Sequence, residues 1–193
     1  MRRIAVIAIA AWSACAPRIA PLVDADEIAG AFLLQQHLRV TRPDGVTELD
    51  AVLQNGCGEL LLMALTPLQT RAFVVRQRGR RIESDLAAGV ALPFDPARVL
   101  VDVERTYFVP IGDPPRDGSR TVHWRDQQID ETWRDARLVE RTYFVGRREQ
   151  VRVEYPDGMR PGELPRRTAL VYGASGFRID VETMARTEIR CAP

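Results

Sequence analysis

The amino-acid sequence predicts an α+β fold, in which a strongly curved antiparallel sheet folds over helices. Three observations support this fold class. Most of the chain consists of short segments of alternating apolar and polar residues, separated by turns rich in Gly, Pro, Asn and Asp. One central segment instead has apolar residues at helical spacing. The length of 193 residues suits one globular domain, which we expect to span residues 24–193.

The first half of this domain is expected to form a helical turn followed by an antiparallel meander. Asp24 and Glu27 have the spacing of a capping box, which predicts a short helix. Strands are expected at residues 32–40, 46–54, 59–65, 71–77 and 81–86, with turns at 43–45, 55–56 and 79. Because residues 59–65 are apolar at almost every position, we expect this strand to be covered on both faces.

A helix is expected near the middle of the chain, and strands return after it. Asp95 supplies a side-chain cap and Pro96 takes the first helical position. Apolar residues at helical spacing continue to Phe108, and three prolines between residues 110 and 115 end the helix. Strands are then expected at residues 121–124, 131–134, 137–145, 150–155, 169–172 and 177–183, with turns at 157–158 and 173–176.

One heptapeptide, Val-Glu-Arg-Thr-Tyr-Phe-Val, occurs twice, at residues 103–109 and 139–145. The flanking residues do not match, so the repeat does not indicate a duplicated module. We expect the first copy at the end of the helix and the second in a strand, because tertiary context can override local preference. We assign no function to the repeat.

The N-terminal residues predict a bacterial lipoprotein signal. Two arginines and a short apolar run precede small residues and Cys15, although Trp12 stands where Leu is usual in such a signal. We expect a signal peptide at residues 1–14, lipidation of Cys15 and a tether at 15–23. Ala16, rather than Asp, follows the cysteine, which indicates the periplasmic face of the outer membrane. The alternative is ordinary signal cleavage that leaves Cys15 unmodified.

The composition excludes several function classes. A formal net charge of +1 gives no clustered excess of cations for nucleic acid. Three cysteines and two histidines leave little material for a metal site, and no motif for zinc, phosphate or dinucleotide binding occurs. We therefore expect no enzyme activity, metal or cofactor. His37, His123 and the acidic residues Asp126, Asp130 and Glu131 are expected to be solvated or hydrogen-bonded.

The two later cysteines and the inward-facing apolar residues each leave two interpretations. Cys57 and Cys191 form a disulfide in an oxidising compartment, or they remain two separate buried thiols. A curved sheet encloses either a filled core or an apolar cavity, and a cavity would suit a lipid-like ligand. The candidate lining residues, inferred from strand parity, are Phe32, Leu34, Phe73, Phe108, Tyr143 and Phe144.

The order of elements resembles the LolB family of outer-membrane lipoproteins, which receive other lipoproteins from the carrier LolA. The resemblance rests on residues 61–68 (LLMALTPL), the helix start at Asp95-Pro96, and the segments around residues 164–165, 169–171 and 177–181. The chain is still more similar to LolB-like lipoproteins often encoded in aryl polyene biosynthesis clusters. The resemblance implies an incomplete antiparallel barrel closed by helices, with an apolar cavity for acyl chains.

The resemblance also implies a function and a membrane-insertion residue. Leu68 matches a leucine that touches the membrane from an exposed loop, while Gln69 replaces the glycine usual after it. The alternative is a Leu68 folded back over the barrel mouth. The implied function is binding of acyl chains or another lipid, for lipoprotein, lipid or aryl polyene transport or membrane insertion, with a LolA-like periplasmic carrier as partner. The alternative is a structural or assembly lipoprotein whose sheet edge docks a protein partner of the cell envelope.

Overall fold

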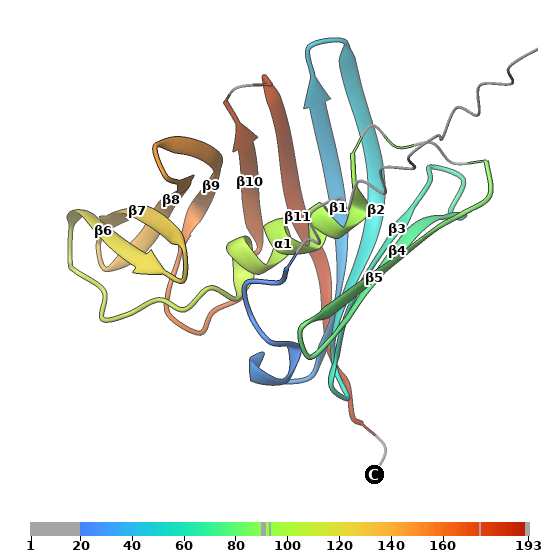
Figure 1. The fold of residues 1–193 in the computed structure, drawn as a ribbon, viewed down its shortest axis with the longest axis horizontal. Coiled ribbons are helices and arrows are strands. Elements are labelled where there is room, and N and C mark those ends of the chain that lie inside the picture. The colour runs from blue at the N-terminus through green and yellow to red at the C-terminus, as the bar shows by residue number, and fades with distance from the viewer. Residues whose placement is uncertain (1–19, 90–91, 93, 174, 192–193) are drawn as a thin grey trace, which may run out of the picture.

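The computed structural model describes residues 20–89, 92, 94–173 and 175–191. The expected signal peptide and Cys15 lie outside the described residues. Within them the chain forms one antiparallel sheet of eleven strands and one α-helix (Figure 1). The elements are η1 (Ala25–Glu27), β1 (Phe32–Arg42), β2 (Gly45–Gly56), β3 (Glu59–Leu65), β4 (Arg71–Arg78), β5 (Arg81–Leu86), α1 (Pro96–Tyr107), β6 (Gly118–Trp124), β7 (Gln127–Arg134), β8 (Arg137–Val145), β9 (Arg148–Met159), β10 (Arg167–Tyr172) and β11 (Phe177–Glu188).

The sheet consists of two meanders joined at the middle. Its strand order is β5-β4-β3-β2-β1-β11-β10-β9-β8-β7-β6, so β1 pairs with β11 and the two arms run outward from that pair. Strands β5 and β6 are the free edges, and the sheet is open. This arrangement confirms the expected antiparallel sheet and α1, but closure by several helices is not confirmed, because the described residues contain only α1 and the short 3-10 turn η1.

Helix α1 crosses the inner face of the sheet, as Figure 1 shows. The Asp95 carboxylate accepts a hydrogen bond from the Ala97 N–H at 2.9 Å, as expected for the cap. At the other end, the hydroxyls of Tyr143 and Tyr155 donate to helix carbonyls of Arg105 and Thr106, at 2.6 and 3.0 Å. These contacts hold α1 against β8 and β9.

The two copies of the heptapeptide adopt different structures, as expected. Residues 103–107 belong to α1, whereas residues 139–145 belong to β8. Glu104 of the first copy is fully buried, but the matching Glu140 is half-exposed. The surroundings of each copy therefore decide its conformation, since the residues themselves are identical.

Three local expectations were wrong. Strand β3 alternates buried and half-exposed residues, because its outer face is not covered. The turn after β2 is Cys57-Gly58, both with left-handed backbone (φ of 59° and 72°), so Asn55 lies inside β2. Residues 157–158 do not form a hairpin turn: β9 continues through them to Met159, and the positive φ of Gly158 only bends the strand.

Candidate functional site

A cavity of about 1120 Å³ lies between α1 and the inner face of the sheet. It extends to the loops at the end of the sheet that carries the β1–β2 and β3–β4 turns, since Pro43 and Pro67 line it. The wall formed by β1 to β4 is mostly apolar, with Arg42, Thr47 and Glu48 near the β1–β2 turn as its polar residues. Its apolar residues are Leu38, Val40, Leu49, Ala64, Leu65, Ala72 and Phe73, and Val99 of α1 and Phe94 add to them.

The opposite wall of the cavity is polar. Asp102 and Arg105 of α1 form an ion pair with a nitrogen–oxygen distance of 2.6 Å, and the Tyr172 hydroxyl donates to the second Asp102 oxygen at 2.6 Å. Burial, followed by the adjacent Asp102 carboxylate, raises the pKa of Tyr172. Gln127 and Arg125 complete this side. The cavity therefore has one apolar and one hydrogen-bonding half.

The segment of residues 20–28, which we call the N-terminal strap, forms part of the wall. Figure 1 shows it in blue, running from α1 to η1. Its Leu22 N–H donates to Glu104 of α1 at 2.6 Å, and the Gln77 side chain donates to the Val23 carbonyl at 2.7 Å. Ala25 bonds the backbone of Gly79. The strap is therefore held by both α1 and the β4–β5 end of the sheet.

The structure corrects most of the expected cavity lining. Of the six candidate residues, only Phe73 lines the cavity. Phe32 and Leu34 are almost fully buried in the core beneath one part of α1. Tyr143 belongs to a second core cluster, and Phe108 packs against that cluster. Phe144 lies half-buried next to Tyr143, so its side chain points to the other face of β8. Strand parity correctly placed Phe32, Leu34 and Tyr143 inward, but α1 fills the space in front of them, and Phe108 is the C-cap of α1 and lies on no strand.

The loop between β3 and β4 displays Leu68 to solvent, with 85% of its surface exposed. The Leu68 side chain does not line the cavity, although Thr66 and Pro67 of the same loop do. Gln69 has a left-handed backbone (φ of 59°), a conformation that favours the glycine expected at this position. Its side chain donates to Asp50 at 2.7 Å, and Thr66 and Thr70 are bonded across the loop. The loop therefore has a defined shape without the glycine.

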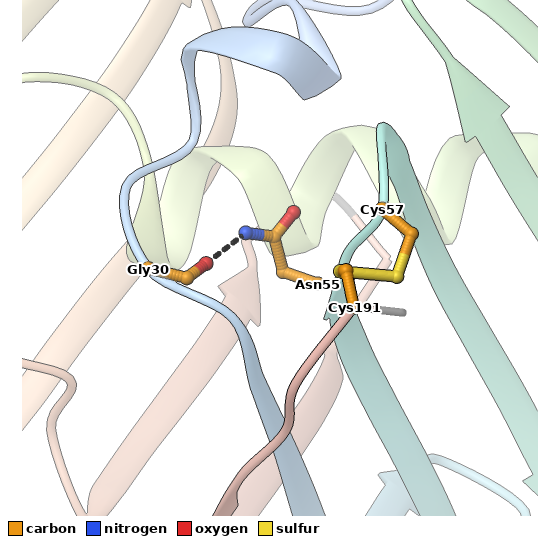
Figure 2. Close-up of a disulfide and its surroundings, with 4 residues drawn as sticks. All are labelled: Gly30, Asn55, Cys57 and Cys191. Carbon is orange, nitrogen blue, oxygen red and sulfur yellow. Dashed lines mark hydrogen bonds between the residues drawn. A yellow bond between two sulfur atoms is a disulfide. The ribbon is translucent and has the colours of Figure 1, made fainter. Parts of the chain in front are cut away.

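The structure joins Cys57 to Cys191 by a disulfide, which Figure 2 shows beside Asn55. The bond connects the β2–β3 turn to the segment after β11, across 134 residues of sequence. The Asn55 side chain donates to the carbonyls of Ile28 and Gly30 (Figure 2 shows the bond to Gly30). This end of the sheet, opposite the cavity mouth, is thereby cross-linked.

One buried charged cluster was not predicted. Glu131, expected to be solvated, is 1% exposed and accepts bonds from Arg141 at 2.7 Å and Arg120 at 2.7 Å. Arg141 also donates to the Val109 and Pro110 carbonyls, so it fastens the chain after α1 to β8. Alternation along β7 was the available signal, because Ile129, Glu131 and Trp133 share the inner face.

The described residues contain no group of three or more His, Cys, Asp or Glu side chains that could hold a metal ion. None of the helices in this part of the chain is long and apolar enough to cross a membrane. His37 lies on the outer face and its Nδ1 is 2.9 Å from Asp50, as expected for a hydrogen-bonded histidine.

The fold and the cavity define a one-domain protein with an open, curved sheet around an internal space. The chain belongs to the family described as "Protein of unknown function (DUF3261)", whose model matches residues 33–185. None of the curated proteins matches the chain.

Three solved structures are similar to this one at low sequence identity. A putative outer membrane lipoprotein-sorting protein domain from Vibrio parahaemolyticus has a TM-score of 0.53 and 10% identity, over 88% of this chain and 89% of that one. A LolA superfamily protein from Nitrosomonas europaea has a TM-score of 0.49 and 13% identity, over 85% and 88%. A DUF1329 family protein from Desulfovibrio piger has a TM-score of 0.49 and 10% identity, over 86% and 89%. The Vibrio domain shows that the chain shares the fold of that domain.

Proposed function

We propose that this protein binds the apolar part of a lipid or acylated molecule in the cavity between α1 and the sheet, for transport or membrane insertion in the bacterial cell envelope. The observation that carries the proposal is the cavity itself, whose volume of about 1120 Å³ slightly exceeds the roughly 300–1,000 Å³ common for ligand pockets. Its wall along β1–β4 is mostly apolar. The fold shared with the Vibrio parahaemolyticus domain supports the same role.

The energetics favour a chain-like ligand. Each methylene removed from water contributes about 0.8 kcal/mol. A stretch of ten methylenes laid along Leu38, Leu49 and Phe73 therefore contributes about 8 kcal/mol before the cost of ordering the chain. Such recognition is weakly selective, since an apolar wall distinguishes ligands mainly by size. The proposed cargo is a lipoprotein, a free lipid or the aryl polyene lipid implied by the resemblance.

The proposal includes an envelope location. A lipid on Cys15 would hold the protein at the periplasmic face of the outer membrane. A LolA-like carrier is the proposed partner that delivers the cargo. Acyl labelling that persists in a Cys15→Ser variant would contradict this anchor.

We propose a non-catalytic role. On the polar wall, Asp102 is already engaged by Arg105 and Tyr172, so its carboxylate does not serve as a free general base.

The alternative role, a scaffold that docks a partner at a sheet edge, has less support: β5 carries Arg81, Glu83 and Asp85, and charges along an edge strand oppose pairing with another strand.

Native mass spectrometry of the gently purified protein tests ligand binding. We expect co-purified lipid on the wild type and loss of most of it in Ala72→Trp, because the indole occupies the apolar half of the cavity. Ala185→Trp is the matched control, since Ala185 is exposed on β11 and does not line the cavity. A wild type that carries no lipid and takes up no fluorescent fatty acid would overturn the proposal.

A further inference from the structure

Two arginines from opposite arms of the sheet meet at the N-terminal strap. Arg80 lies in the β4–β5 turn and Arg125 in the β6–β7 turn. The two guanidinium groups donate to the same atom, the carbonyl oxygen of Pro21, at 3.4 and 3.0 Å respectively. Both residues line the cavity. Residues 45 positions apart in sequence are therefore brought to one point of the cavity wall.

These two cations are exposed and, within the described residues, neither forms an ion pair, although Asp126 follows Arg125 in the chain and also lines the cavity. The part of the chain that the structure describes contains every Asp and Glu, yet none of them forms an ion pair with Arg80 or Arg125. Glu104 is near enough to feel the charge of Arg125, but its Oε2 accepts the Leu22 N–H, and burial raises its pKa to about 7. Arg105, on the same wall, is neutralised by Asp102 instead.

This arrangement suits an oxyanion. Two like charges that share one neutral acceptor repel each other, and each guanidinium has five N–H donors, most of them unused here. A carboxylate or phosphate group offers several acceptor oxygens and a negative charge, so it can bind both guanidinium groups and remove the repulsion. The neighbouring carbonyl of Pro21 supplies no charge of its own.

The position of the pair relative to the apolar wall defines the ligand. Most apolar residues of the cavity lie on β1–β4 and the N-terminal half of α1, and Ile179 of β11 and Leu22 of the strap add to them. Arg80 and Arg125 lie at the strap. We propose that Arg80 and Arg125 form an oxyanion-binding subsite of this cavity, which takes the carboxylate or phosphate end of an amphiphile whose chain lies along β1–β4. This subsite rests on the proposed lipid-binding function and adds the chemistry of the polar end.

The test compares two fluorescent probes with the same chain, cis-parinaric acid and its methyl ester, in titrations of the full-length protein. The wild type should bind the acid about tenfold more tightly than the ester, because charge-assisted hydrogen bonds to the carboxylate are absent for the ester. The variant Arg80→Gln/Arg125→Gln should lose this preference and keep its affinity for the ester. Arg80→Lys/Arg125→Lys should keep part of the preference, since it keeps the charges.

The control is Arg160→Gln/Arg186→Gln, which removes two exposed arginines that do not line the cavity and should leave both affinities unchanged. Unchanged preference in Arg80→Gln/Arg125→Gln would overturn the subsite and leave the cavity proposal intact. Failure of the wild type to bind either probe would overturn the cavity proposal itself. Displacement of the acid by an equal concentration of inorganic phosphate would overturn the amphiphile as the ligand of this subsite, because it would show a site for free anions.

Discussion

Glu104 connects the helix to the N-terminal strap through a carboxyl group that is fully buried. Burial raises its pKa from 4.5 to about 7, against the opposing effects of bonds from Leu22, Val23 and Gln77 and the charge of Arg125. Between about pH 4.5 and 7 the folded protein keeps a proton that the unfolded chain has released. The contribution of Glu104 to the free energy of unfolding is therefore fully present below pH 4.5. It decreases by about 3 kcal/mol in total as the pH rises from about 4.5 to 7.

We predict that Glu104→Gln removes this pH dependence. The amide cannot ionise, so the variant should match the wild type near pH 5 and be more stable by about 2–3 kcal/mol near pH 8. Urea unfolding at four pH values between 5 and 8 measures the difference. The control is Glu140→Gln, the same position in the second heptapeptide, which is half-exposed on β8. Parallel stability curves for the wild type and Glu104→Gln would contradict the prediction.

At the scale of elements, the β3–β4 loop has a defined shape that exposes one apolar side chain, Leu68. Its backbone and side-chain bonds hold Gln69 in the left-handed region and leave Leu68 exposed. The Asp50 carboxylate that binds Gln69 also faces His37, and these two hydrogen bonds lower the pKa of Asp50. An exposed leucine gains free energy on entering a bilayer, by up to about 1.5–3 kcal/mol.

Leu68→Glu should weaken binding to vesicles of phosphatidylethanolamine and phosphatidylglycerol. It should change the free energy of unfolding by no more than about 0.5 kcal/mol, because the side chain contacts solvent. Co-sedimentation measures binding in a Cys15→Ser background, so that no lipid anchor contributes. Met184→Glu is the matched control, since Met184 is 63% exposed on β11, outside this loop. If Leu68→Glu binds vesicles as strongly as the wild type, or loses much of its stability, Leu68 has another role.

The whole molecule is an open half-barrel whose two ends differ. At one end the disulfide, Asn55 and the strap cross-link the chain, and at the other the loops surround the cavity mouth. We predict that Cys57→Ser/Cys191→Ser lowers the free energy of unfolding by about 2–5 kcal/mol, because the bridge closes a loop of 134 residues.

Thermal and urea unfolding of the oxidised wild type and the double serine variant check this prediction. The same variant should still bind the fatty-acid probe, since neither cysteine lines the cavity. Equal stability of the two proteins would show that the strand pairing of β1 with β2 and β11 alone holds this end together.

Local features were predictable wherever a few neighbouring residues determine the backbone. The β1–β2 turn at Pro43-Asp44 and the start of α1 at Asp95-Pro96 follow from fixed proline torsions and a side-chain cap. Strand identity followed from alternation. The predicted boundaries were less accurate where a distant segment contacts the strand. Asn55 was predicted to be a turn residue, yet it is buried because its amide donates to two carbonyls of the segment before β1.

The candidate site was predictable only in outline. Inward parity of Phe32, Leu34 and Tyr143 was correct, but whether an inward residue meets helix or empty space depends on where α1 lies. Burial of Glu131 depends on Arg141, ten residues later, reaching it across the paired strands. Alternation along β7 indicates that Glu131 faces inward, but no local pattern identifies Arg141 as its partner.

The sequence by itself determined the strands, most turns and the single long helix, because these depend on backbone torsions and on alternation within a few residues. Only the tertiary structure decided where the cavity lies, and that Arg80 and Arg125 meet at Pro21. The physical reason is the separation in sequence between the residues that determine each feature. A cap or a turn is satisfied by its neighbours, whereas a cavity wall and a shared carbonyl require two arms of one sheet to curve toward each other.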